Sequence, residues 1–287
     1  MKFIRCITLG SIIIISFSAQ AQFFDRVNPS MDLTLAAGVA SYYGDLVQKS
    51  PIFREPSFAI SAGMSYNHNP HLSLRADMSF LQIKGSDAKN SRPDLIARNL
   101  SFKSLVFDIN TSIEYNVLDI TGEEHKFTPY IFLGVGICHF DPYTKDRNGN
   151  KVMLQPLGTE GQGLDAYPDR TPYARTILQV PFGGGIKYAI SDKISLGFEF
   201  KYRYVDTDYL DDVSNAGYPD RALLAAKNPA LPFLTYRADQ LPGGKAYTST
   251  NTLGLSRGNP NNKDAYYTGQ FKLIYKIKRY SANDINY

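Results

Sequence analysis

The feature that most constrains this chain is a two-residue alternation of apolar and polar side chains, which recurs from Met31 almost to the end of the sequence. It is clearest in Ile194–Val205, where aromatic and aliphatic residues occupy every second position and Glu199, Lys201 and Arg203 lie between them. Successive side chains of a β-strand point to opposite faces. The pattern therefore predicts strands with one apolar and one polar face, and it leaves little room for helices.

Eight segments carry this pattern. Most of them are long enough to cross the apolar core of a bilayer at a tilt, which takes about 9–11 residues. The predicted strands are Met31–Tyr43, Ser57–His68, Leu72–Lys84, Leu100–Asn116, Thr128–Phe140, Thr176–Ile190, Ile194–Val205 and Ala265–Lys278.

The connections between these segments alternate in length. The shorter set is Asn69–His71, Val117–Phe127 and Ser191–Lys193, and the longer set is Gly44–Pro56, Gly85–Asn99, Asp141–Arg175 and Asp206–Asp264. Short turns on one side and long loops on the other are typical of a bacterial outer-membrane barrel, whereas a soluble sandwich has no reason to sort its loops by length. We therefore predict an eight-stranded antiparallel transmembrane β-barrel in which the first strand pairs with the last.

Two finer expectations follow for this barrel. An even strand count places both termini on the short-turn side, which is the periplasm in such barrels. Pro181 and Gly183–Gly185 interrupt the sixth strand, and because proline cannot donate to the ladder we expect a bulge or sharp bend there.

The N-terminal residues have the pattern of an export signal. Lys2 and Arg5 precede an apolar stretch, and Ala19-Gln20-Ala21 fits the small-x-small cleavage rule. The alternative, a permanent membrane helix, needs about 20 apolar residues, and this stretch is shorter. The predicted organisation is a cleaved signal peptide at 1–21, a periplasmic segment at 22–30, the barrel at 31–278 and a periplasmic tail at 279–287.

Composition indicates which surroundings and partners suit this protein. The formal net charge of +4 is too weak a bias to argue for nucleic acid, which requires a concentrated basic patch. The chain has 20 Tyr and 17 Phe but no Trp, so tyrosine and phenylalanine must form the aromatic girdles that flank a lipid-facing band. Outer-membrane lipid is the predicted surrounding.

The polar face of the predicted strands carries charges of both signs. An eight-stranded barrel is just wide enough for side chains to fill it. We expect an ion-pair network that plugs the lumen, because unpaired buried charge is costly; the alternative is an ion path. The predicted lumen charges are Arg75, Asp77, Asp108, Glu114, Lys187, Glu199, Lys201, Arg203 and Lys272.

Residues with catalytic or metal-binding chemistry are sparse. Glu160 lies among glycines, and we expect its carboxylate to tie down backbone amides of a folded loop rather than act as a general base. Asp206, Asp208, Asp211 and Asp212 suit either calcium or capping of the following loop, and the residues alone leave this open. We predict no catalytic residue, no cofactor and no established metal site.

Seven segments together resemble a known family. Two are the most specific: one holds Thr159, Glu160, Gly161, Gln162 and Gly163, and the other holds Asp208, Tyr209, Leu210, Asp211 and Asp212. The seven are Gly38–Leu46, Arg98–Phe102, Thr128–Gly136, Pro156–Gly163, Val180–Tyr188, Thr207–Ser214 and Arg257–Asp264. In order along the chain, they resemble the Bacteroidota outer-membrane β-barrel family that includes PorG of the type IX secretion system.

The resemblance implies a non-enzymatic barrel that tethers a periplasmic ring, built from a PorK-like lipoprotein and a PorN-like partner, to the outer membrane. The surfaces available to such a ring are 22–30, 69–71, 117–127, 191–193 and 279–287, whereas the two specific motifs lie on the opposite side. One alternative is a structural or surface-adhesion barrel that binds through its long loops. Another is an outer-membrane enzyme that acts on lipid or peptide.

Overall fold

The structure is a computed structural model, and it describes residues 29–47, 55–90, 92–120, 124–214, 216–245, 255–258 and 263–279. The predicted signal peptide at 1–21, nearly all of the segment 22–30, and the tail from residue 280 onward lie outside the described residues. Those parts of the predicted organisation therefore stay predictions.

Nine strands and several short helices are present among the described residues. The strands are β1 (Ser30–Tyr43), β2 (Ser57–Asn67), β3 (Leu72–Ser86), β4 (Ser101–Asn116), β5 (Phe127–Lys145), β6 (Lys151–Met153), β7 (Thr176–Ala189), β8 (Ile194–Val205) and β9 (Ala265–Arg279). The helices are η2 (Asp87–Lys89), α2 (Pro93–Arg98), η3 (Gln155–Leu157), α3 (Arg221–Lys227), α4 (Leu231–Thr235) and η4 (Ala238–Gln240).

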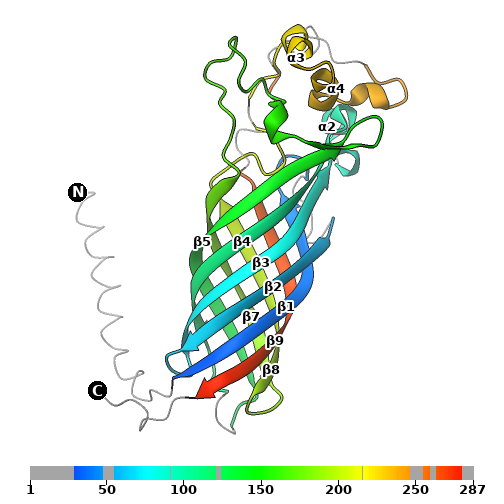
Figure 1. Cartoon of the computed structure of the whole chain (residues 1–287). Coiled ribbons are helices and arrows are strands. Elements are labelled where there is room, and N and C mark those ends of the chain that lie inside the picture. The colour runs from blue at the N-terminus through cyan, green and yellow to red at the C-terminus, as the bar shows by residue number, and fades with distance from the viewer. Residues whose placement is uncertain are drawn as a thin grey trace, which may run out of the picture.

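Eight of these strands close into one antiparallel barrel (Figure 1). The pairing order runs β4-β3-β2-β1-β9-β8-β7-β5, and a further pairing of β4 with β5 completes the ring. Ser30 of β1 pairs with Arg279 of β9, so the first and last strands meet as predicted. Strand β6 stands outside the ring and pairs only with the end of β5. The predicted fold class and strand count are confirmed.

Two details differ from the sequence-based expectation. The pairing of β5 with β7 skips the positions around Pro181 but keeps the same register on both sides, so the expected bulge is wrong. The register shift lies instead between Met31 and Asp32 of β1, against β9. Strand β5 also continues past Phe140 to Lys145, where it turns back into β6 through a hairpin with Gly149 at φ 83°.

The barrel has a different character at each end. The connections β2–β3, β4–β5 and β7–β8 lie at one end, which we name the turn end. The other end, named the loop end, carries α2, α3 and α4 (Figure 1). Local signals explain these helices: the Asp220 side chain accepts hydrogen bonds from Ala222 N and Leu223 N at the start of α3. No helix in the described part of the chain is long and apolar enough to cross a membrane.

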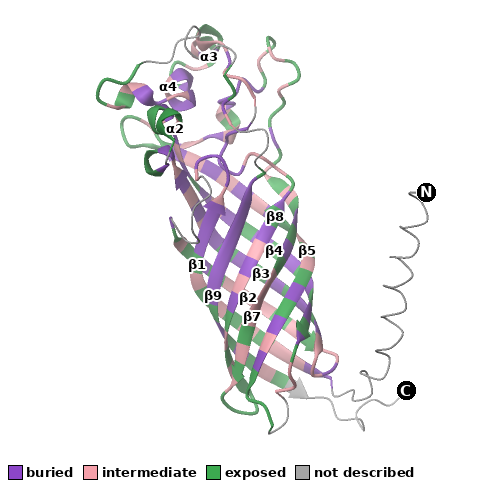
Figure 2. Cartoon of the chain, turned by 180° about the vertical axis from the view of Figure 1, so that it is seen from behind, coloured by how far each residue is buried: buried purple, intermediate pink, exposed green. Residues whose placement is uncertain are grey.

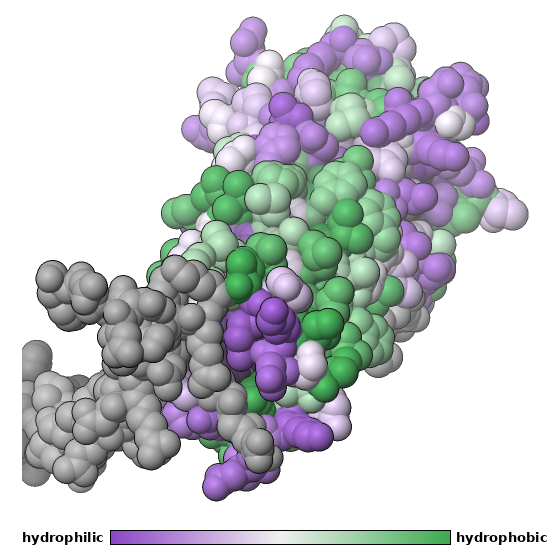
Figure 3. All heavy atoms as spheres, turned by 60° about the horizontal axis from the view of Figure 1, so that its bottom comes forward, coloured by the Kyte–Doolittle hydropathy of each residue, from purple (hydrophilic) through white to green (hydrophobic). Residues whose placement is uncertain are grey.

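Apolar side chains form a band across the face of the barrel that Figure 3 shows. Phe107, Ile131, Leu133 and Phe271 are exposed there. Exposed tyrosines border the band near the turn end on four strands, in place of tryptophan; these are Tyr66, Tyr115, Tyr188 and Tyr275. The outside is thus built for lipid, with tyrosine forming the girdle.

Burial is greatest towards the loop end (Figure 2). The apolar core lies there, inside the upper barrel and beneath the loops, and it includes Leu81, Ile83, Val106, Phe140 and Val205, none of which is exposed. The loop residues Leu210 and Val213 belong to the same core. The structure therefore has one continuous core that joins the barrel to the loops above it.

Candidate functional site

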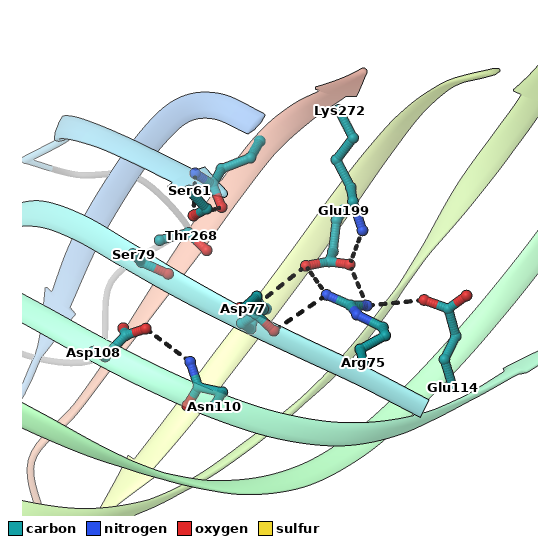
Figure 4. A network of polar contacts seen from close by, with 12 residues as sticks. Ser61, Arg75, Asp77, Ser79, Asp108, Asn110, Glu114, Glu199, Thr268 and Lys272 are labelled. Carbon is teal, nitrogen blue, oxygen red and sulfur yellow. Dashed lines mark hydrogen bonds and ion pairs between the residues drawn. The ribbon is translucent and has the colours of Figure 1, made fainter. Parts of the chain in front are cut away.

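The centre of the barrel holds an ion-pair network around Glu199 (Figure 4). Glu199 Oε2 lies 2.8 Å from Arg75 Nη1 and 2.8 Å from Lys272 Nζ. The Tyr130 hydroxyl donates to the same oxygen at 2.8 Å. Lys201 Nζ lies 3.6 Å from Glu199 Oε1. One buried carboxylate thus connects residues from β3, β5, β8 and β9.

The other lumen charges extend this network. Arg75 Nη1 also lies 2.9 Å from Glu114 Oε2, and Glu114 pairs with Lys187. Asp77 pairs with Lys201. A separate pair joins Arg203 Nε to Asp108 Oδ2 at 2.9 Å, nearer the loop end. All nine charges predicted for the lumen lie inside the barrel, and each has an oppositely charged partner.

This packing leaves little open space in the middle of the barrel. A cavity of about 20 Å³ lies beside Arg75, Asp77 and Glu199, which is room for about one water molecule. Above it, the apolar core closes the way to the loops. The arrangement supports the plug rather than the ion path.

A second buried polar cluster lies among the loops at the loop end, and its first centre is Glu160. The carboxylate of Glu160 accepts hydrogen bonds from Ser214 N at 2.8 Å and from Ser214 Oγ at 2.6 Å. Arg257 Nη1 lies 3.3 Å from Glu160 Oε1, and it donates to Thr159 Oγ1 at 2.8 Å and to Asp212 O at 2.6 Å. The Glu160 carboxylate therefore binds the backbone amide of Ser214, which belongs to another loop.

Asp212 is the second member of this cluster. Its backbone is left-handed, at φ 67°, and its carboxylate accepts hydrogen bonds from Thr159 Oγ1 at 2.5 Å and from the Tyr173 hydroxyl at 2.8 Å. Burial raises the pKa of Asp212 to about 6, against the opposing effect of Arg257. The two sequence motifs, which are far apart along the chain, are thus bonded directly to each other.

A third centre is the hydroxyl of Tyr42, at the end of β1. It lies 2.7 Å from Asp211 Oδ2 and 2.6 Å from Asp264 Oδ1, and it accepts a hydrogen bond from Asp45 N at 3.0 Å. A hydroxyl has one proton to donate, so one of the two carboxyl groups must hold a proton for both contacts to be hydrogen bonds. Burial raises the pKa of Asp211 and of Asp264 well above the ordinary value.

An arginine fork joins a further loop to this cluster. Arg98 Nε and Nη2 each donate to Asp87 at 2.7 Å, and Arg98 Nη1 donates to the backbone oxygen of Arg257. Such bidentate pairs fix orientation as well as position. We name the whole set the loop-end cap; its charged members are Asp45, Asp87, Arg98, Glu160, Asp211, Asp212, Arg257 and Asp264.

The remaining motif residues shape the cap. Gly161 and Gly163 have positive φ angles of 83° and 72°, and Gln162 Oε1 accepts a hydrogen bond from Glu160 N at 2.9 Å. The ring of Tyr209 stacks on Tyr173 at 4.4 Å. Leu210 enters the apolar core, and Asp208 lies near Asp264 and raises its pKa.

Sequence reasoning missed Tyr42, Arg98, Tyr173 and Arg257 as members of the cap. Arg98 and Arg257 each begin one of the resemblance segments, so a signal was present, but no local pattern tells which acid either one contacts. Among the residues that the structure describes, no group of three or more His, Cys, Asp or Glu side chains is arranged to hold a metal ion.

The turn end contrasts with the cap because its described residues surround a large cavity. A cavity of about 680 Å³ lies there, between the barrel strands and the turns. The charged residues of its lining are Asp32, Lys126, Lys187, Asp192, Lys193 and Lys276, so four lysines face two acids. Lys126 and Lys193 are exposed at its rim.

Several solved structures of outer-membrane proteins are similar to this chain. Neisserial surface protein A is 12% identical, with 87% of this chain and 99% of that chain covered and a TM-score of 0.42. The attachment invasion locus protein Ail of Yersinia pestis, in complex with the heparin analogue sucrose octasulfate, is 7% identical, with 88% and 99% covered and a TM-score of 0.39. The outer membrane protein OprG of Pseudomonas aeruginosa is 9% identical, with 87% and 98% covered and a TM-score of 0.38. No curated protein matches the chain in sequence.

A family description matches the sequence itself. The outer membrane protein beta-barrel domain matches residues 7–219, which is most of the chain. The chain therefore belongs to the outer membrane protein beta-barrel domain family.

Proposed function

We propose that this outer-membrane β-barrel protein is a non-enzymatic component of a type IX secretion system, similar to PorG of the Bacteroidota. In this proposal the turn end and both termini face the periplasm. The barrel tethers a ring of PorK-like lipoprotein and PorN-like protein to the outer membrane. The proposal rests first on the resemblance of the seven segments, which include the two motifs that bond to each other in the loop-end cap.

The observation that carries the proposal is the difference between the two ends of the barrel. Motif carboxylates at the loop end are bonded within the chain and buried, as Glu160 illustrates. The turn end offers an open cavity of about 680 Å³ with exposed lysines at its rim. A periplasmic ring reaches only the turn end of a barrel in this orientation, so that open surface suits a tether.

The same contacts argue against an enzyme that uses Glu160. A general base must lie within hydrogen-bond reach of the proton that it removes from a substrate. Both oxygens of Glu160 are bonded to Ser214, and the residue is completely buried. A substrate would have to displace the loop to reach it.

Two experiments test the tether. Deleting the gene should abolish export of type IX cargo and leave other surface proteins unchanged. A tagged wild-type barrel, captured from membranes in mild detergent, should retain the PorK-like and PorN-like proteins. Normal cargo export in the deletion strain would refute the secretion role.

A matched pair of variants then locates the contact surface. Lys193→Glu reverses an exposed charge at the turn end and should weaken ring capture, and adding Lys126→Glu should deepen the loss. Lys263→Glu reverses an exposed charge at the loop end and is the control. Equal ring recovery from all variants would remove the turn end as the contact.

The alternative is an adhesion barrel that binds through the loop end. The extent of the cap, with three short helices above the barrel, is the observation that favours it. In that case shortening the α3–α4 region should abolish attachment to the partner surface, whereas Lys193→Glu should have no effect on attachment.

A further inference from the structure

Four lysines lie together on the outer surface of the barrel at the loop end. Lys84 of β3 is directly opposite Lys103 of β4 in the strand pairing, and Lys145 of β5 is directly opposite Lys151 of β6. The four sit on neighbouring strands that are about 4.8 Å apart. We name this set the lysine patch.

These strand positions bring like charges face to face without a compensating acid. Like charges directly opposite each other in a sheet are destabilising. Within the described part of the chain, none of the four lysines has a salt bridge. Lys151 Nζ lies over the Tyr143 ring, 4.1 Å from its centroid. Lys103, Lys145 and Lys151 are exposed, and Lys84 is half-buried.

Two acids near the patch in sequence are already engaged, as is Asp239, which pairs with a neighbouring arginine of the β5–β6 hairpin. Asp141 pairs with Arg175, Asp146 accepts hydrogen bonds within its own hairpin turn, and Asp239 pairs with Arg147. The positive charge of the lysine patch is therefore not neutralised by the loops that surround it.

The position of the patch identifies what can neutralise it. On β3 the patch begins two outward positions beyond Phe80, and on β4 it lies two outward positions beyond Phe107; both phenylalanines are exposed on the apolar band. Tyr143 pairs with Lys103 and accepts a hydrogen bond from Gln82 Nε2 at 3.3 Å. An aromatic and several cations at the edge of an apolar band are typical of the level of lipid headgroups.

We propose that the lysine patch binds the phosphate groups of a phosphorylated glycolipid in the outer leaflet. The apolar band contacts the acyl chains, and Lys84, Lys103, Lys145 and Lys151 contact the phosphates above them. This inference goes beyond the tether, and it rests on the proposed function only for the orientation that places the loop end outside the cell.

The experiment compares lipid binding by the full chain in nanodiscs. The probes are lipopolysaccharide, the same lipopolysaccharide after phosphatase treatment, phosphatidylglycerol and inorganic phosphate. Two variants are compared with the wild type. One combines Lys103→Gln with Lys145→Gln, and the other, the fourfold variant, changes all four patch lysines to Gln. Lys263→Gln, two residues before β9 on another part of the loop end, is the control, and heat-modifiable gel migration verifies that each variant is folded.

Wild-type protein should bind the phosphorylated lipid in a salt-dependent manner, and binding should fall roughly fivefold for each lysine removed. Phosphatase treatment should cause a loss similar to that of the fourfold variant, and Lys263→Gln should bind like the wild type. Equal binding of the dephosphorylated lipid, or a fourfold variant that binds like the wild type, would overturn the proposal. Preference for phosphatidylglycerol or for inorganic phosphate alone would also overturn it.

The same variants separate this inference from the tether. Ring capture uses the opposite end of the barrel, so it should be unchanged in the fourfold variant. Loss of lipid binding with normal ring capture supports the patch, whether or not the secretion role holds.

Discussion

The lumen network and the loop-end cap are both buried and both charged, but they balance their charges differently. In the lumen, five cations face four carboxylates; the cations are Arg75, Lys187, Lys201, Arg203 and Lys272. In the cap, Arg98 and Arg257 face six carboxyl groups, so backbone amides, hydroxyls and at least one shared proton satisfy the rest. The lumen is therefore held by ion pairs, whereas the cap also depends on protonation.

The two regions also differ in what positions their side chains. Lumen residues lie on strands that pair with a neighbour on each side in the closed ring. Most cap residues lie outside the barrel strands, and their contacts join the connections 85–99, 141–175 and 206–264 to each other and to Tyr42 at the end of β1. The two regions share an apolar core, but different parts of one structure can still open with different free energies when their other contacts differ. We therefore expect the cap to open while the barrel stays folded.

The largest expected effect is that of Glu199→Gln in the lumen. The change removes a charge that neutralises Arg75 and Lys272, and breaking a buried pair costs about 3–5 kcal/mol. The free energy of unfolding of the barrel should fall by this order, measured by urea titration with heat-modifiable migration. Glu124→Gln, at an exposed position of the turn end, is the matched control. A stable Glu199→Gln barrel would mean that the network contributes little.

The same substitution in the cap, Glu160→Gln, should have a smaller and local effect. The change replaces one of the two carboxylate oxygens that accept hydrogen bonds from Ser214 by an NH₂ group, which cannot accept. The Ser214 donor that loses its acceptor is then buried and unsatisfied, which costs about 1–3 kcal/mol. Proteolysis of the loops in reconstituted protein should become faster, while heat-modifiable migration stays normal. Simultaneous loss of barrel and loops would show that the two regions form one cooperative unit.

A change of pH should affect the stability of the loop-end cap more than that of the barrel. The pKa of Asp212 is raised to about 6 in the closed cap, so the closed cap holds this proton more tightly than the open one. The resulting stabilisation is greatest at low pH and is lost as the pH rises through about 6. The raised pKa values of Asp211 and Asp264 act in the same direction.

Loop proteolysis by a protease active over this range, corrected for its own pH profile, should therefore be slower at pH 4.5 than at pH 7.5. Asp212→Asn should flatten the part of this change near pH 6. A cap that tightens as the pH rises would contradict the assignment of shared protons.

The smallest expected effect is that of Tyr42→Phe. The ring keeps its edge contact with Phe102, at 4.9 Å between centroids, but the hydroxyl that joins Asp211 and Asp264 is lost. A hydrogen-bonding group of this kind contributes about 1 kcal/mol. Loop proteolysis should quicken slightly at all pH values, and the urea midpoint of the barrel should stay within error. A shift of that midpoint would place Tyr42 in the barrel unit.

The contrast also explains what the sequence could predict. Two-residue alternation identifies which face of each strand a charge occupies, so Arg75, Glu199 and Lys201 could be placed in the lumen from local pattern alone. The cap could not be derived in this way, because Tyr42 contacts Asp264 across 222 residues and Arg257 contacts Thr159 across 98. Pro181 was misleading for a physical reason: the ladder omits the pairs near it without inserting a residue, so no bulge is needed.

The most direct measurement of the central claim is hydrogen exchange, by mass spectrometry, of the wild-type chain in nanodiscs. We compare amides of β4 and β8 with those of 207–214, after correction for the chemical exchange rate at each pH. The account predicts that 207–214 exchanges through a separate, lower-energy opening that becomes easier as the pH rises from 5 to 8, whereas β4 and β8 stay protected at every pH. Equal protection of the two sets, or a joint loss of protection in both, would contradict the separation of cap and barrel.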